Sequence, residues 1–238
     1  TSGQGGSSGT SGTSPGGGAS PIELLNTNQL VSASIGATVS NNPDFSIAIG
    51  YAANGKNIYN DADRGAIAIG KNSLSSGRET LAIGEGAHAA QGQAGIAIGK
   101  NAGGGSGIQD SALGIGVSTV ALNGGAVAIG YEARAQGNYC VSIGSQNPIN
   151  YGHKSITIGS EAGMRDYDFC EESVTIGWQA KMKQSYAISI GSNAIATATY
   201  STAIGYNATA SHIGSVALGY GMTSSVSNHT HIKSLFIN

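Results

Sequence analysis

The sequence is poor in charge, aromatic rings, cysteine and long apolar runs. Charged residues make up 10% of its 238 residues, where about 25% is usual, and the formal net charge is −2. No basic cluster is present, which argues against a nucleic-acid partner. No stretch approaches the roughly 20 apolar residues of a spanning helix, so we expect no membrane insertion by this segment. The two cysteines, Cys140 and Cys170, are too few for a disulfide framework.

Signatures of catalysis are also missing. The sequence contains no G-x-S-x-G, H-E-x-x-H or C-x-x-C motif, and its Gly-x-Gly strings precede no plausible helix. A glycan-cleaving enzyme would need paired carboxylates in a groove. The candidate pairs, Asp61 with Asp63 and Asp166 with Asp168, lie in loop-like insertions. We therefore predict a protein without enzymatic activity.

Glycine is present in excess, with 39 residues, and it recurs at a regular spacing. The four residues before each repeat glycine alternate between small and large aliphatic side chains, as in Ser46-Ile47-Ala48-Ile49. The gaps between repeat glycines are never shorter than fourteen residues, and seven of the twelve equal fourteen. The repeat glycines stand at positions 36, 50, 70, 84, 99, 116, 130, 144, 159, 177, 191, 205 and 219.

The alternation predicts a short strand in every repeat. Alternate side chains of a strand point to opposite faces, so Ile47 and Ile49 share one face and Ala48 lies on the other. We expect the large residues to fill the interior and the small ones to let another surface approach closely. The glycine then supplies a turn, because it adopts positive φ without steric cost. A second turn is expected within residues 133–137 and their equivalents.

Two strands and two turns in fourteen residues predict a solenoid of stacked coils. Parallel strands stack about 4.8 Å apart, so twelve intervals give a rod roughly 58 Å long. A single coil stack would leave a long, weakly polar face exposed, which monomers rarely do. Several such stacks packed about one axis would cover it, and the periodicity alone does not fix their number.

The pattern S-x-A-I-G-x-x-A-x-A-x-G/S, as at residues 201–205 and 215–219, resembles the head repeat of trimeric autotransporter adhesins, the YadA-like head. The resemblance covers about residues 31–221. It implies an all-β fold, a left-handed parallel β-roll solenoid of ~14-residue coils, in which three chains form one homotrimer. The sequence departs from the adhesin pattern, because no neck motif follows Gly219 and several gaps are stretched.

The same repeat also occurs in fibre proteins of bacterial viruses. We therefore expect a trimeric fibre segment of a bacteriophage virion, structural and serving host-cell attachment. The alternative is the head of a bacterial surface adhesin that binds host matrix or cells, and a further alternative is a pure spacer. The implied partners are two further copies of the chain, a cell-surface receptor of glycan or protein nature, and other fibre or virion proteins.

The repeat also divides the chain. Residues 1–20 are expected to form a Gly/Ser/Thr-rich linker or a collagen-like lead-in. Residues 21–35 are expected to cap the solenoid, which needs a cap at an open end. Residues 36–221 form the predicted β-roll, and residues 222–238 an exit segment.

Two insertions are the expected sites of recognition, because charged and aromatic residues gather in them. Residues 54–64 add six residues to a coil, and residues 160–172 add four. Aromatic and arginine side chains are typical binding anchors, although an ordinary solvated loop is the alternative. The candidate binding residues are Tyr59, Arg64, Met164, Arg165, Tyr167, Phe169 and Trp178.

Aromatic residues directly follow the repeat glycine at five positions, which places them in one line along the rod. This line is either a ladder that packs the corner of the solenoid or a stripe for sugars or a surface partner. Its members are Tyr51, Tyr131, Trp178, Tyr206 and Tyr220.

His229 and His231 are candidate metal ligands. They stand two residues apart and would share one face of a strand. In a three-fold assembly they would offer six imidazoles, which suit iron or another transition metal. Rings of His-x-His that bind iron are a feature of some phage fibres, and the alternative is a pair of solvent-facing histidines. Cys140 is expected to be a small buried filler, about 10 Å along the axis from Cys170 and so too far for a disulfide.

Overall fold

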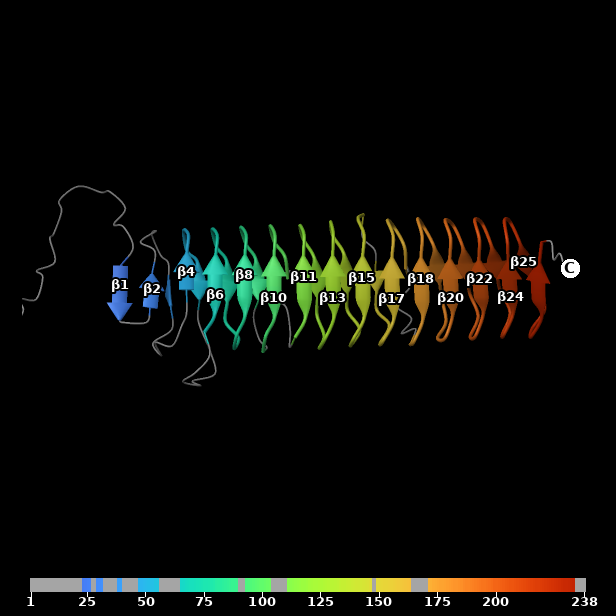
Figure 1. Cartoon of the computed structure of the whole chain (residues 1–238), viewed down its shortest axis with the longest axis horizontal. Helices are drawn as coiled ribbons and strands as arrows, with labels where there is room; N and C mark the ends of the chain where they lie inside the picture. Colours follow the sequence, from blue (N-terminus) through green and yellow to red (C-terminus); the bar gives the residue numbers. More distant parts are fainter. Residues whose placement is uncertain are drawn as a thin grey trace, which may run out of the picture.

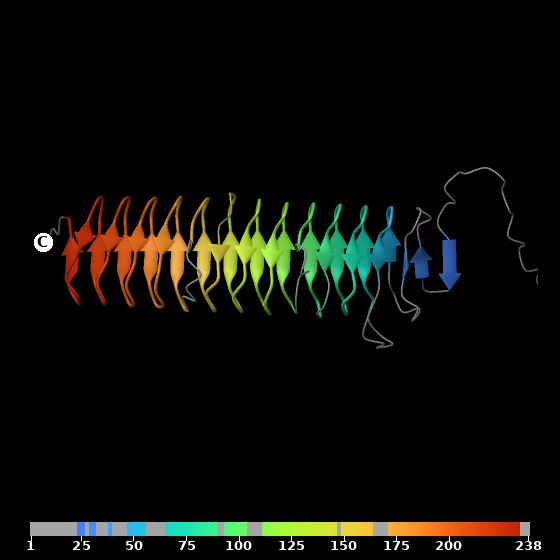
Figure 2. The same cartoon turned by 180° about the vertical axis from the view of Figure 1, so that it is seen from behind.

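The computed structural model shows a rod of stacked coils, with strands at right angles to its long axis (Figures 1 and 2). Strands β1 and β26 lie at opposite ends of the rod. The predicted all-β parallel solenoid with coils of about fourteen residues is therefore confirmed. The structure describes residues 23–26, 29–31, 38–39, 47–55, 65–89, 93–103, 111–146, 149–163 and 171–233.

One face of the rod is a continuous sheet, which has 15 strands in the described part of the chain. Its first two strands are antiparallel, and every later neighbour is parallel. In sheet order the strands are β1 (Glu23–Asn26), β2 (Gln29–Val31), β4 (Ile47–Ile49), β6 (Ile67–Ile69), β8 (Leu81–Ile83), β10 (Ile96–Ile98), β11 (Leu113–Ile115), β13 (Val127–Ile129), β15 (Val141–Ile143), β17 (Ile156–Ile158), β18 (Val174–Ile176), β20 (Ile188–Ile190), β22 (Thr202–Ile204), β24 (Val216–Leu218) and β26 (Thr230–Ile232).

The second strand of each coil has two residues, and these strands form parallel sheets of three or four strands in the described residues. Single bridges from Ile149 to Gly163 and from Gly163 to Lys181 join two of these sheets. The strands are β3 (Thr38–Val39), β5 (Asn54–Gly55), β7 (Leu74–Ser75) and β9 (His88–Ala89); β12 (Val120–Ala121), β14 (Arg134–Ala135) and β16 (Ile149–Asn150); and β19 (Lys181–Met182), β21 (Ile195–Ala196), β23 (Thr209–Ala210) and β25 (Thr223–Ser224).

From Gly50 to Gly219, the repeat glycines form a ladder in which each stacks on the next. Gly191 has φ +128°, and the Gly205 N–H donates to the carbonyl of Ile190 at 2.8 Å. A Cβ added to Gly191 would lie 2.5 Å from the carbonyl oxygen of Gly205, closer than real Cβ atoms approach. Glycine is therefore required both by its backbone angle and by the lack of space. The predicted glycine turn is confirmed.

The second turn lies later than the sequence predicted. Arg134 and Ala135 form strand β14, and the chain turns after them at Tyr139, which has φ +54°. Each coil whose turns the structure describes thus has a left-handed position at both of them, as at Asn193 (φ +55°) and Tyr200 (φ +60°).

The predicted orientation of the strands is wrong. The small residues face the interior and the large aliphatic residues face outward, as in β20, where Ser189 is fully buried between the partly exposed Ile188 and Ile190. The second strands follow the same rule, since Ala135 is buried and Arg134 is not. The two strands of a coil therefore face each other across a space that holds mostly methyl and hydroxymethyl groups.

The interior is a narrow alanine core with a polar middle. One apolar cluster runs from Ala82 to Cys140, and a second runs from Met182 to Ala217. From the end of the first cluster into the start of the second, the inward residues of β15, β17, β18 and β20 are hydroxyl-bearing and fully buried. These are Ser142, Thr157, Thr175 and Ser189.

Asn150 replaces the usual small residue in a coil that is one residue longer than fourteen. Its side-chain amide donates to the carbonyls of Ser155 (2.8 Å) and Val141 (3.0 Å), and its Oδ1 accepts the N–H of Gly152 (3.0 Å). These bonds satisfy a fully buried amide, so the extra residue is accommodated without an unpaired polar group at this side chain.

Candidate interaction surfaces

The outward face of the main sheet carries two columns of aliphatic side chains. From Ile49 in β4 to Ile232 in β26, the third residue of every paired strand is isoleucine or leucine. The first residue is also aliphatic except at Thr202 and Thr230. We call this surface the aliphatic face. It runs the length of the rod and is partly exposed in the single chain.

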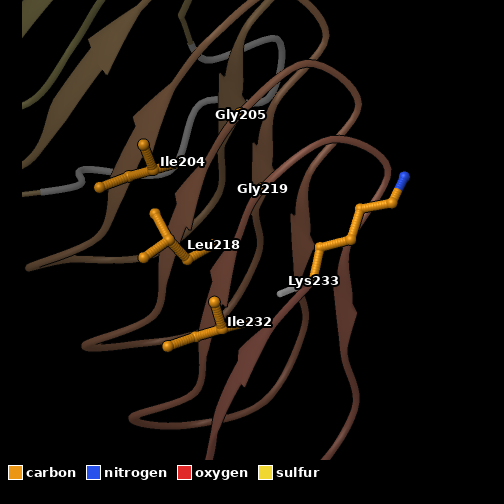
Figure 3. Close-up of a pocket in the computed structure, with 6 residues that line it drawn as sticks. All are labelled: Ile204, Gly205, Leu218, Gly219, Ile232 and Lys233. Carbon is orange, nitrogen blue, oxygen red and sulfur yellow. The ribbon is translucent and has the colours of Figure 1, made fainter. Parts of the chain in front are cut away.

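The aliphatic face is hollowed at its C-terminal end. Ile204, Leu218 and Ile232 lie one above another on three successive strands, and the Lys233 side chain extends away from them (Figure 3). The hollow is open to solvent and has a volume of about 660 Å³. An apolar hollow that continues a long apolar stripe is a surface built to be covered.

Aromatic side chains stack along both edges of the rod. Tyr206 and Tyr220, which each follow a repeat glycine, stack with ring centroids 5.4 Å apart and planes 12° apart. Tyr186 and Tyr200 stack at the other turn, with centroids 5.0 Å apart. Trp178 lies on the first of these edges and is 50% exposed. The predicted line of aromatic residues is therefore a ladder in part, and its rings remain accessible.

Lys233 closes this ladder at the C-terminal end. It stands fourteen residues after Gly219, so it occupies the position of a repeat glycine. Its Nζ lies 4.5 Å from the centroid of the Tyr220 ring and donates to the Tyr220 carbonyl at 3.2 Å. One coil earlier, the equivalent carbonyl of Tyr206 accepts the N–H of Gly221. The lysine ammonium thus donates to the carbonyl whose equivalent in the preceding coil accepts a backbone N–H from the next coil. Sequence reasoning missed this residue, although the period identifies it.

The two histidines occupy the last described coil. His231 pairs in register with Ala217, so it belongs to the inward series of the sheet, and its Nδ1 lies 2.8 Å from Ser224 Oγ. His229 is exposed, and its Nδ1 lies 2.7 Å from the Ser227 carbonyl oxygen, to which it donates. Within one chain, the described residues contain no group of three or more metal-ligating side chains. The predicted ring of six imidazoles needs further chains and stays a prediction.

Cys140 is buried at the first position of its strand repeat, as the sequence predicted. Burial raises the pKa of its thiol to about 11, and the thiol donates to the Gly137 carbonyl at 2.9 Å. A neutral, hydrogen-bonded and inaccessible thiol is a packing residue rather than a nucleophile. Cys170 lies outside the described residues.

Of the predicted binding residues, the structure describes Trp178 alone. The other candidates fall in the two insertions and lie outside the described residues, so their role stays a prediction. They are Tyr59, Arg64, Met164, Arg165, Tyr167 and Phe169. The carboxylate pairs of the same insertions, Asp61 with Asp63 and Asp166 with Asp168, also lie outside them.

The comparison with protein families bears directly on the glycine ladder and the strand repeat. The model of the YadA head domain repeat, two copies in length, matches residues 64–87, 75–102, 106–133, 121–147, 180–208 and 196–221. These matches cover just over half of the chain.

The chain belongs to the YadA head repeat family. No curated protein matches it. Within the part of the chain that the structure describes, no helix is long and apolar enough to cross a bilayer.

Proposed function

We propose that the chain is a segment of a homotrimeric attachment fibre, in which three copies bury their aliphatic faces against one another around a common axis. The single observation that carries this proposal is the aliphatic face itself. An apolar stripe as long as the rod is rarely left in water, and a closed symmetric assembly covers it on every copy. The number three and the left-handed winding come from the family, whose heads assemble as trimers.

The energy of covering this face is large because the repeat multiplies a small contribution. Burial of apolar surface stabilises by about 25 cal/mol per Å², which is on the order of 1 kcal/mol for each partly exposed aliphatic side chain. Ile156 and Leu218, for example, retain 37% and 38% of their exposure in the single chain. Association has its own entropic cost, but dozens of such side chains in three copies outweigh it.

The role we infer for the trimer is structural and adhesive, without catalysis. Its family is that of surface adhesins, and the coil stack presents the aromatic side chains of its edges outward along a rod. The Gly/Ser/Thr-rich residues 1–20 favour a virion fibre as its setting, because such lead-ins resemble linkers of phage fibres. The family favours the second setting, a bacterial surface.

Direct binding tests the adhesive role and its setting together. The fluorescently labelled protein is applied to a panel of bacterial strains and to collagen, fibronectin and laminin surfaces. Saturable binding to one bacterial strain supports the virion fibre, and binding to a matrix protein supports the adhesin. Binding to none of them contradicts attachment by this segment and leaves the spacer role.

A matched pair of variants tests the insertions in the same assay. Replacing Tyr167 and Phe169 by alanine should weaken binding at least tenfold, whereas Tyr51→Ala removes an exposed aromatic outside the insertion and should not. Equal effects of the two variants would refute the assignment of receptor recognition to the insertion at residues 160–172.

A further inference from the structure

The aromatic ladder that follows the repeat glycines is interrupted between Trp178 and Tyr206. The Asn193 N–H donates to the Trp178 carbonyl (2.9 Å), and the Asn207 N–H donates to the Ser192 carbonyl (3.0 Å). Trp178, Ser192 and Tyr206 therefore occupy the same position in three successive coils. The middle position has only a hydroxymethyl group, so two aromatic side chains flank a place with no ring.

The width of this interruption follows from the repeat. Rings on adjacent coils keep close to the coil spacing, since Tyr206 and Tyr220 are nearly parallel and 5.4 Å apart. Trp178 and Tyr206 are two coils apart, which is roughly 10 Å. A flat aromatic ring between them would need only about 7 to 8 Å, because carbon atoms make contact at 3.5–4.0 Å. A puckered saturated ring with hydrogens on both faces is thicker and fills the space better.

The groups at this place match the two kinds of surface on a sugar. Trp178 and Tyr206 are 50% and 46% exposed, so their rings are available to the apolar C–H faces of a pyranose. Ser192 occupies the position between them in the coil stack, and Asn193 and Asn207 directly follow Ser192 and Tyr206, so one hydroxyl and two side-chain amides of this neighbourhood can bond to ring hydroxyls. The end of the ladder is closed, because the Lys233 ammonium already lies over Tyr220.

We propose that Trp178, Ser192 and Tyr206 form a binding slot for a neutral pyranose sugar. The slot rests on the proposed attachment role, for which it supplies the chemical class of the receptor. It repeats on each copy of the assembly, so weak individual contacts would add up on a surface that displays many glycans.

Intrinsic fluorescence gives a direct test, because Trp178 is the only tryptophan in the chain. The folded protein is titrated with glucose, galactose, N-acetylglucosamine and their short oligomers, and the tryptophan emission is followed. We expect a saturable change with at least one of these sugars. No change with any of these sugars would overturn the proposal. Quenching by acrylamide is a second measurement, which tests whether Trp178 is accessible to solvent. If acrylamide cannot quench the emission, a neighbouring chain covers the slot and the proposal is also overturned.

The decisive variant is Ser192→Tyr, which completes the ladder without disturbing the interior. The equivalent positions one and two coils further along the chain are already Tyr206 and Tyr220, so the variant should keep its melting temperature. It should lose sugar binding at least tenfold. The control is Ser145→Tyr, which adds a ring at the equivalent position of another coil and should bind as the unmodified chain does. Sugar binding by Ser192→Tyr at unchanged affinity would refute the slot.

The same variant separates this proposal from the attachment role. If Ser192→Tyr attaches to its target surface as strongly as the unmodified chain, the slot is wrong and attachment stands. If sugar changes the fluorescence while no surface is bound, the slot stands and the attachment role is wrong.

Discussion

Replacing Gly191 by alanine should destabilise the protein far more than the same change at Gly221. Gly191 has φ +128°, which side chains rarely allow, and the new Cβ would lie 2.5 Å from the Gly205 carbonyl oxygen. Backbone strain of this kind costs about 1–3 kcal/mol, and overpacking costs a similar amount. Alanine restricts the unfolded chain and returns up to about 1 kcal/mol. The net loss should be about 1–6 kcal/mol.

Gly221 is the matched control because it differs in both respects. Its φ is +61°, in the left-handed region that other residues adopt, and no atom lies within 4 Å of an added Cβ. Gly221→Ala should therefore change the stability by only about 1 kcal/mol. Gly219 should fall between them, because its added Cβ would meet the Lys233 side chain at 3.1 Å rather than a backbone carbonyl.

Thermal unfolding followed by circular dichroism, at equal chain concentrations, checks this order. For a chain of this length, each 1 kcal/mol lowers the melting temperature by about 2–4 °C. Gly191→Ala should therefore melt about 2–24 °C lower than the unmodified protein. If it melts no lower than Gly221→Ala, the glycine ladder does not constrain the fold and the reasoning is refuted.

Three further changes test other parts of the structure. In a Cys170→Ser background, Cys140 should react with iodoacetamide at least a hundredfold more slowly in the native than in the unfolded protein. Because the folded-state pKa of that thiol is raised from 9.0 to about 11, its contribution to stability should be full below pH 9 and lost as the pH rises toward 11, measured by denaturant unfolding. Ala203→Leu should lower the free energy of unfolding by about 1–3 kcal/mol or more, because the larger side chain overpacks the interior. The control is the neighbouring outward substitution Thr202→Val, which should leave the free energy of unfolding unchanged. Equal effects of the two variants would mean that the inward and outward faces of the strand are assigned wrongly. Lys233→Ala removes an exposed cation–π contact and should lower the same free energy by less than about 1 kcal/mol, so a larger loss would mean that the lysine has a further structural role.

The sequence was sufficient to predict the stacking of the strands but not which face points inward. The glycine period fixed the coil length, and the structure confirms the parallel pairing of, for example, β20 and β22. Alternation alone gives two faces without naming the inner one. The outcome follows from the circumference of the coil. A fourteen-residue coil with two turns is too narrow to enclose Ile188 and Ile190 together with the second strand, so the smaller Ser189 points inward.

The candidate surfaces were predictable to different degrees. The aliphatic face consists of residues that we predicted from the sequence to fill the core. The alternation therefore identified which residues lie together on one face, but that face points outward rather than inward. Lys233 at a glycine position could have been found by counting fourteen residues from Gly219. The stacking of Tyr186 on Tyr200 was harder to predict, because it required the true position of the second turn.

The central claim is that the aliphatic face is buried between three copies of the chain. Sedimentation equilibrium tests it most directly. We expect a single species of three times the 23.6 kDa chain mass. We also expect that Ile190→Asp, an outward substitution on that face, shifts the species toward the mass of one chain. A folded protein that sediments as a single chain without any substitution, with its aliphatic face in water, would contradict the account.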